Sequence, residues 1–258
     1  MGKKILISGG FGLLAQQLIP ELMKEANEIC IISRKDKRTS KHKQLKFIQI
    51  DMSKRISKTD LMYMGEYSPD IFIDLVGAHG CIDASYKLNS GDFDSAFNIN
   101  FFSFIDIVNS IMNPMIENNF GRILSFSGGG VTSPRPYFSP YACSKIAKYK
   151  YIENLSEEIS EKKKNIKVNY IAPGIMHSNL LKDGLSSGFI SKNEKEKIDN
   201  TKDNQDIIFS KNITLIKKLI SDNLDISGRL ISSQWDDFEI FSKKSTNESD
   251  LGRLIRKN

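Results

Sequence analysis

Tyr141 and Lys145, four residues apart, are the two side chains best suited to acid–base chemistry in this sequence. Positions i and i+4 lie on one face of a helix, so the phenol and the ammonium can point into the same pocket. A free tyrosine has a pKa of about 10, and a lysine cation held close to it favours the phenolate and lowers that pKa. The spacing therefore predicts a general acid and base that works near neutral pH.

A glycine-rich turn near the N-terminus supplies the second chemical feature. An apolar run at 3–8 predicts a short buried strand, and 12–26 has the pattern of a helix. Between them, Gly9, Gly12 and the small Ala15 follow at intervals of three residues, which lets a pyrophosphate approach the backbone at the helix N-terminus. We expect a dinucleotide to contact this turn, through Ser8, Gly9, Phe11, Gly12 and Leu13.

These two features together resemble the short-chain dehydrogenase/reductase family, and the resemblance spans nearly the whole chain. It implies that Tyr141 exchanges a proton with a carbonyl or alcohol substrate, while Lys145 lowers the tyrosine pKa and holds the nicotinamide ribose. It assigns the hydrogen bond to the developing oxyanion to Ser127, and the placing of a relay water to Asn100. Further cofactor contacts are implied for Asp51, Met52, Gly77, Tyr141, Lys145, Pro173, Gly174 and Ser178.

The sequence departs from the family pattern at two places. The family's Asn-Asn-Ala-Gly is here Asp74-Leu75-Val76-Gly77, which alters the cofactor contacts at that turn without removing them. The family's catalytic serine stands thirteen residues before the tyrosine, a position that Gly128 occupies here. We expect the preceding Ser127 to take that role, because the glycines at 128–130 can re-aim the backbone. The alternative is that Ser127 only caps the strand, in which case the protein would be a poor catalyst.

The elements that must position these residues alternate along the chain. Strands are expected at 3–8, 28–33, 45–50, 70–76, 121–127, 166–172 and 229–232, and helices at 12–26, 58–67, 92–118, 139–162 and within 178–222. The alternation predicts one Rossmann domain over residues 1–258, an α/β fold with a doubly wound parallel sheet of about seven strands. Residues 175–205 are expected to be a substrate lid or, alternatively, a surface helix pair without gating. Residues 243–258 are expected to be a flexible tail or to dock on a partner subunit.

Composition excludes several classes of function. The net charge of +6 comes from lysines spread among acids, and no nucleic-acid motif accompanies them. Three cysteines and three histidines show no ligand spacing, so we expect no metal site. Neither a signal peptide nor an apolar run of the roughly 20 residues that span a membrane is evident, which favours a cytoplasmic protein.

The second expected strand ends in Ser33-Arg34-Lys35. An acid at position 33 would bind the ribose hydroxyl of NAD(H) and repel a 2′-phosphate, whereas the cations that follow suit a phosphate. NADP(H) is therefore preferred and NAD(H) remains open, since Arg34 could instead stack on the adenine.

These features favour an oxidoreductase that transfers hydride between a nicotinamide and a carbonyl or alcohol. Segments 127–139 and 231–237 resemble a subgroup associated with sugar and polysaccharide biosynthesis, which suggests a sugar or nucleotide-sugar substrate. Trp235 could contact sugar hydroxyls or pack at the end of the sheet. Two alternatives stay open: a sugar-nucleotide epimerase or dehydratase with retained NAD, and a non-catalytic dinucleotide-binding protein. The family also implies a homodimer or homotetramer through 92–118 and 139–162, where Phe101, Phe102, Phe104 and Ile105 could serve the interface or the core.

Overall fold

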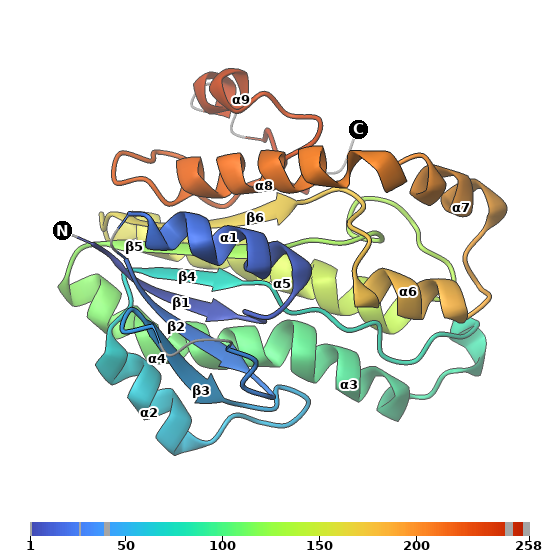
Figure 1. Ribbon diagram of the computed structural model, residues 1–258, viewed down its shortest axis with the longest axis horizontal. Coiled ribbons are helices and arrows are strands. Elements are labelled where there is room, and N and C mark those ends of the chain that lie inside the picture. The colour runs from blue at the N-terminus through green and yellow to red at the C-terminus, as the bar shows by residue number, and fades with distance from the viewer. Residues whose placement is uncertain (1, 26, 39–41, 246–249, 255–258) are drawn as a thin grey trace.

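A computed structural model describes residues 2–25, 27–38, 42–245 and 250–254. Seven parallel strands form one sheet in the order β3-β2-β1-β4-β5-β6-β7, which confirms the predicted doubly wound α/β fold (Figure 1). The strands are β1 (Lys4–Ser8), β2 (Glu28–Ser33), β3 (Leu45–Gln49), β4 (Ile71–Asp74), β5 (Gly121–Phe126), β6 (Ile166–Ala172) and β7 (Leu230–Ser232). The chain crosses from β1 outward to β3 and then returns past β1 to β4. The carboxyl ends of β1 and β4 therefore flank the point where the direction of winding reverses.

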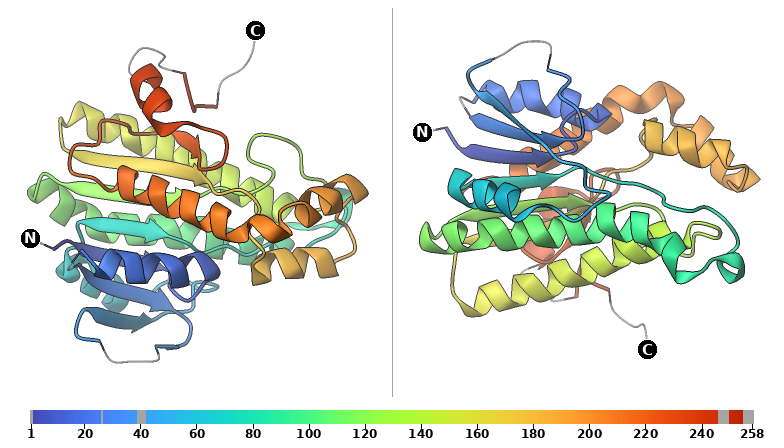
Figure 2. Two further views of the ribbon diagram at one scale, coloured as in Figure 1. Left: turned by 45° about the horizontal axis from the view of Figure 1, so that its top comes forward. Right: turned by 90° about the horizontal axis from the view of Figure 1, so that it is seen from below.

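Helices cover both faces of this sheet (Figures 1 and 2). One face carries α2 (Lys58–Tyr67), α4 (Ser103–Glu117) and α5 (Ser139–Glu161), and the other carries α1 (Leu13–Met23) and α8 (Gln205–Leu219). The remaining helices are α3 (Asp94–Phe97), α6 (Asn179–Ser186), α7 (Lys192–Asp199) and α9 (Phe238–Ser245). Figure 1 shows α6 and α7 beyond the arrowheads of the strands, on the side where ligands bind in parallel sheets.

The core consists of two apolar layers, one on each face of the sheet. Phe72 and Ile123 face the α4–α5 layer, whereas Ile73 and Leu124 face the α1–α8 layer. All six residues of β5 are buried, because a central parallel strand is covered on both sides. This packing fixes the strand ends, from which the loops of the candidate site extend.

The helix predicted at 92–118 is interrupted. A π-helical turn at Asn98–Phe102 separates α3 from α4 and places Asn100 in the interior. Such wider turns are frequent at functional sites. The run Ser90–Glu117 is also the one described helix that is long and apolar enough to cross a membrane, so the expectation that no such run exists was wrong. Its side chains Phe104, Ile107 and Ile111 lie fully buried in the core, and a single such helix is weak evidence for a membrane span.

The C-terminal segment is only partly described. Within the expected tail, 246–249 and 255–258 lie outside the described residues. The described part is docked on its own chain: the Leu230 N–H donates to the Gly252 carbonyl at 2.8 Å, and the Leu254 N–H donates to Glu153 Oε1 at 3.1 Å. Residues 250–254 therefore continue the packed structure past α9.

Candidate active site

A groove of about 900 Å³ opens at the carboxyl ends of β1, β2, β3 and β4. Eight of the residues expected to bind a dinucleotide line it: Gly9, Phe11, Gly12, Ser33, Arg34, Asp51, Met52 and Gly77. They come from four separate loops that the sheet brings to one edge. The sequence motifs thus converge in space as the expected strand ends require.

Glycine is needed at Gly9 because the backbone there has φ +70°, and a Cβ atom would lie 3.1 Å from the Leu75 carbonyl carbon. Gly12 then caps the start of α1 without a side-chain hydrogen bond, and its own N–H donates to the Gly9 carbonyl at 2.9 Å. The first N–H groups of α1 therefore end at the groove, where the positive end of the helix dipole suits a pyrophosphate.

Positive charge lines the far end of the groove. Arg34, Lys35 and Lys37 follow β2 and contribute to its wall, whereas the neighbouring Ser33 carries no charge. Across from them, hydrogen bonds from the Ser53 hydroxyl and N–H hold the pKa of Asp51 below its usual range, and the charge of Arg34 adds to this effect.

Seven other expected cofactor residues do not line the groove, Tyr141 and Lys145 of α5 among them. The Ser8 side chain is fully buried and donates to Asp74 Oδ1 at 2.6 Å, so its hydroxyl is committed to the interior. Ser178 instead caps α6, its hydroxyl accepting from the Leu181 N–H at 3.3 Å. The remaining three are Leu13, Pro173 and Gly174. The walls instead include Asn179, Leu180 and Asp183 of α6, which the sequence motifs did not indicate.

Tyr141 and Lys145 lie one turn apart near the start of α5, as their spacing predicts. The Lys145 ammonium lies 5.7 Å from the centre of the Tyr141 ring and donates to the Phe126 carbonyl at 2.9 Å and the Val76 carbonyl at 3.3 Å. Burial lowers the pKa of Lys145 to about 7, an effect that the charge of Lys148 strengthens. The amine therefore changes charge near neutral pH.

The tyrosine is shifted in the opposite direction. Tyr141 is only 4% exposed, and this burial raises its pKa to about 12, with Arg135 as the cation that opposes the rise. The expected lowering of the pKa by Lys145 is not seen in this arrangement, because the amine points to backbone carbonyls. Arg135 precedes α5 within the segment 127–139, and the sequence did not indicate a role for this side chain.

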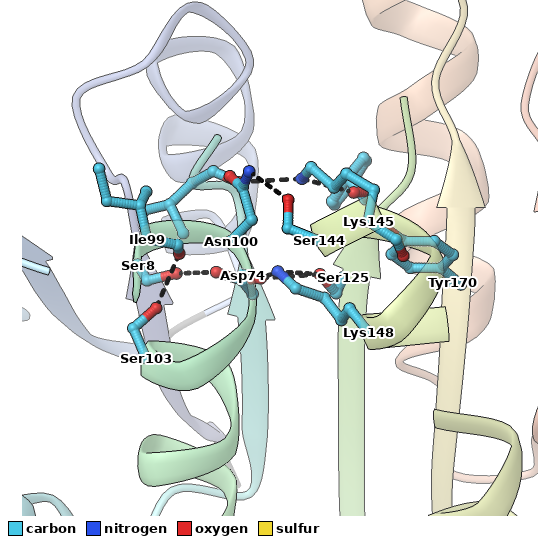
Figure 3. Close-up of polar contacts among 12 residues, drawn as sticks. Ser8, Asp74, Ile99, Asn100, Ser103, Ser125, Ser144, Lys145, Lys148 and Tyr170 are labelled. Carbon is cyan, nitrogen blue, oxygen red and sulfur yellow. Dashed lines mark hydrogen bonds and ion pairs between the residues drawn. The ribbon is translucent and has the colours of Figure 1, made fainter. Parts of the chain in front are cut away.

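Asn100 joins the loop after β4 to α5 (Figure 3). Its side-chain oxygen accepts from the Ala78 N–H at 2.9 Å, and its amide donates to the Ala78 carbonyl and to the Ser144 hydroxyl, both at 2.8 Å. Gly77 lies directly in front of this amide: a Cβ atom at residue 77 would lie 3.7 Å from Lys145 Nζ and 4.0 Å from Asn100 Oδ1. Asn100 thus fixes the loop that faces the lysine.

Gly128 lies beside the tyrosine hydroxyl. A Cβ atom at residue 128 would lie 2.6 Å from Tyr141 Cζ and closer still to its hydroxyl oxygen. No larger residue fits at position 128 unless the phenol moves. Ser127 is half-buried at the end of β5, and its N–H donates to the Ile171 carbonyl at 2.8 Å.

Comparison with known proteins agrees with this arrangement. A model of the short chain dehydrogenase family matches residues 3–186, more than two thirds of the chain. The chain belongs to the short-chain dehydrogenase family. The match includes the glycine turn, Asn100, Tyr141 and Lys145, and it ends at Ser186, the last residue of α6.

Individual short-chain dehydrogenases are distant relatives. The 7alpha-hydroxysteroid dehydrogenase of Escherichia coli strain K12 is 30% identical over 113 residues, 44% of this chain and 43% of that protein. The 3-oxoacyl-(acyl-carrier-protein) reductase FabG of Chlamydia trachomatis is 27% identical over 144 residues, 54% of this chain and 56% of its own length. The chain thus matches about half the length of these relatives.

Solved structures match over nearly the full chain. A short-chain dehydrogenase/reductase of Saccharomyces cerevisiae has a TM-score of 0.78 at 17% identity and covers 93% of this chain and 98% of its own. ElxO with NADP bound has a TM-score of 0.70 at 23% identity, and the match covers 90% of this chain and 97% of ElxO. A 4-hydroxyisoleucine dehydrogenase complexed with NADH has a TM-score of 0.73 at 21% identity, and the match covers 90% of this chain and 96% of that protein. At these identities the similarity shows the fold.

This short-chain dehydrogenase also contains a buried ion pair beneath the site (Figure 3). Lys148 Nζ lies 2.5 Å from Asp74 Oδ2, and both side chains are at most 1% exposed. The hydroxyls of Ser8 and Ser125 donate to the same carboxylate at 2.6 and 2.7 Å. Burial disfavours the charged carboxylate, but the cations of Lys148 and Lys145 outweigh it and hold the pKa of Asp74 below its usual range. Asp74, which departs from the family's Asn-Asn-Ala-Gly pattern, thus belongs to an internal network and does not line the groove.

Trp235 is a further residue of this short-chain dehydrogenase for which the sequence suggested a role. Trp235 is 81% exposed and does not line the groove, so it does not pack at the end of the sheet. Among the described residues, no group of three histidine, cysteine, aspartate or glutamate side chains could hold a metal ion.

Proposed function

We propose that this short-chain dehydrogenase transfers hydride between NADP(H) and the carbonyl or alcohol carbon of a small molecule. One observation carries the proposal: Lys145, one helical turn from Tyr141, donates to the carbonyl of Val76, which lines the groove together with the dinucleotide motif. The groove fits the cofactor because a glycine cradle and the N-terminus of α1 lie at its base. The nicotinamide, when bound, supplies or accepts the hydride.

The chain's own residues handle the proton. Tyr141 donates it from its hydroxyl to the substrate carbonyl oxygen, or removes it from an alcohol in the reverse direction. Lys145, with a pKa of about 7, can take up or release a proton beside the nicotinamide ribose. Ser127 hydrogen-bonds the developing oxyanion, and Asn100 keeps the Ala78 loop in place and positions the relay water.

The preference for NADP(H) over NAD(H) is supported by the charge on the groove wall. Arg34, Lys35 and Lys37 are available to a 2′-phosphate, and Ser33 does not repel it. We propose that Asp51 and Met52 contact the adenine at the other side of this wall, and that Pro173, Gly174 and Ser178 contact the nicotinamide end.

We further propose a soluble, cytoplasmic homodimer or homotetramer that joins through the helical segments 92–118 and 139–162. Phe104 is fully buried in the core, whereas Phe101 and Phe102 of the π-helical turn and Ile105 of α4 are half-buried. A sugar or nucleotide-sugar carbonyl stays the proposed substrate class, on the sequence of residues 127–139.

The proposal is tested with purified protein, NADPH and a panel of sugar and simple ketones, followed by NADPH absorbance. Tyr141→Phe should bind NADPH as the wild type does and lose nearly all turnover. Tyr151→Phe is the matched control, because it removes a hydroxyl from the same helix at a site 3.4 Å from Asn109 Oδ1. Equal turnover by Tyr141→Phe and wild type would rule out the assigned acid.

A second candidate is a non-catalytic dinucleotide-binding protein. Gly128 beside the phenol and the raised pKa of Tyr141 favour it. NADPH binding without turnover of any ketone by the wild type would select this candidate. Tightly held NAD on purification would instead select the epimerase or dehydratase alternative.

A further inference from the structure

Two buried polar atoms without hydrogen-bond partners flank the Tyr141 ring. Within the described part of the chain, His79 Nδ1 and Arg135 Nε are buried and accept or donate no hydrogen bond. The His79 ring packs edge-on against Tyr141 with 5.0 Å between centres, and the Arg135 guanidinium lies 5.6 Å from the centre of the same ring. A buried polar atom without a partner is costly, so each indicates a group that the pocket is built to receive.

Arg135 is held rigidly beside the phenol. Its guanidinium stacks 4.1 Å above the Phe138 ring, and its side chain lies along Gly129, where a Cβ atom would be 3.2 Å from Arg135 Cδ. The side chain is only 12% exposed. A guanidinium fixed in this way, with donors to spare, is suited to binding a carboxylate through two parallel hydrogen bonds.

A carboxylate of the protein itself already occupies this cation. Arg135 donates to Glu194 Oε1 of α7 at 3.1 Å. Nearby, Phe189 stacks on Tyr137 with 4.6 Å between ring centres, so two contacts join the segment 175–205 to the loop before α5. Ile190 and Ile198 of that segment pack on Tyr141 and Phe138.

This packing makes access to the phenol depend on movement of the segment. Tyr141 is only 4% exposed, and Ile190 and Ile198 belong to the apolar cluster that buries it, so movement of this segment would uncover the phenol. The same movement would separate Glu194 from Arg135. The Arg135 guanidinium would then lie without its carboxylate partner beside Tyr141. Uncovered, this cation attracts a negative group that replaces Glu194.

We propose that the substrate carries a carboxylate that binds Arg135 in place of Glu194, while its carbonyl oxygen lies at Tyr141. The substrate class is then an oxo acid, a sugar acid included, and His79 Nδ1 meets a further polar group of the same molecule. Glu194 acts as an internal competitor that holds the segment closed until an acid displaces it. This inference rests on the proposed function.

Binding to the NADP⁺-loaded full-length protein tests the carboxylate site. The probes are pyruvate, acetoacetate and levulinate, each compared by calorimetry with its amide, which has the same shape and no charge. The three acids vary the separation of carbonyl and carboxylate. In wild type, the best acid should bind about tenfold or more tightly than its amide. Arg135→Gln should abolish that difference, and Glu194→Gln should increase it.

Arg55→Gln provides a matched control, because it removes an arginine from an exposed pair with Asp106 far along the sequence from this loop. It should leave the difference between acid and amide at the wild-type value. Equal binding of acids and amides by wild type, binding of neither, or a difference that persists in Arg135→Gln would each overturn the inference.

Turnover separates the inference from the proposed function. If wild type and Arg135→Gln reduced acids and amides equally well, the proposed reductase activity would be supported and the carboxylate site would be refuted. Selective binding of acids that depends on Arg135, without any oxidation of NADPH, would leave the carboxylate site standing and remove the reductase.

Discussion

The Asp74–Lys148 pair makes the energetic cost of a buried charge measurable in this protein. Lys148→Met removes the ammonium 2.5 Å from Asp74 Oδ2 and leaves a carboxylate that is 1% exposed. Removing one partner of a buried pair costs about 3–5 kcal/mol. Because Ser8 and Ser125 still donate to Asp74, we expect the lower end, about 3 kcal/mol of unfolding free energy.

Replacing both partners should be much less harmful than replacing one. The double variant Asp74→Asn/Lys148→Met has no buried charge at this point, so it should be about 2 kcal/mol more stable than Lys148→Met alone. The pKa of Asp74 is lowered in the folded state, so its stabilising contribution is complete above the pKa of an unfolded carboxyl and is lost as pH falls further. A measurement at neutral pH therefore captures the whole effect.

Urea unfolding followed by circular dichroism provides the assay. Lys218→Met is the control, because it removes an exposed partner of Glu239 and should change stability by at most about 1 kcal/mol. The reasoning would be refuted if Lys148→Met were no more harmful than Lys218→Met. Strictly additive effects of the two single changes in the double variant would refute it equally.

Three further predictions concern the groove and the phenol. Arg34→Glu should weaken NADPH binding more than NADH binding in fluorescence titrations, and equal losses would contradict a phosphate contact. Gly128→Ala should lower the unfolding free energy by about 1–3 kcal/mol and reduce turnover, because its Cβ meets the Tyr141 ring; Gly129→Ala, whose Cβ would lie 3.2 Å from its nearest neighbour, Arg135 Cδ, should lower the unfolding free energy less. Burial lowers the pKa of His79 to about 4, so the folded protein binds fewer protons than the unfolded chain between this value and about 6.5. Stability should fall as pH drops through that range, and His79→Gln should flatten the fall in a series of melting temperatures.

The fold and the groove could be predicted from sequence because their signals are local. Alternating apolar runs and helical patterns identified all seven strands, and the Gly9 turn stands directly between a strand and a helix. Parallel strands then bring their carboxyl ends to one edge, so residues as distant as Gly9 and Gly77 could be assigned to one groove.

The features that sequence reasoning missed depend on side-chain direction or on distant partners. Asp74 was noted as a departure, but its partner Lys148 is 74 residues away and has no motif. The Gly128 spacing was also noted, yet only the fold shows that the Tyr141 hydroxyl fills the space of a side chain there. The π-helical turn at Asn98–Phe102 arises from packing, and helical periodicity does not reveal it.

The docked C-terminal segment has a consequence for self-association. β7 is the last strand of the sheet, and an open strand edge is a template on which another chain can pair. Here the Leu230 N–H donates to the Gly252 carbonyl, so residues 250–254 cover part of this border and hinder extension of the sheet. Removal of residues 250–258 would free that donor and favour precipitation through edge-to-edge pairing, while leaving the groove at the opposite half of the molecule intact.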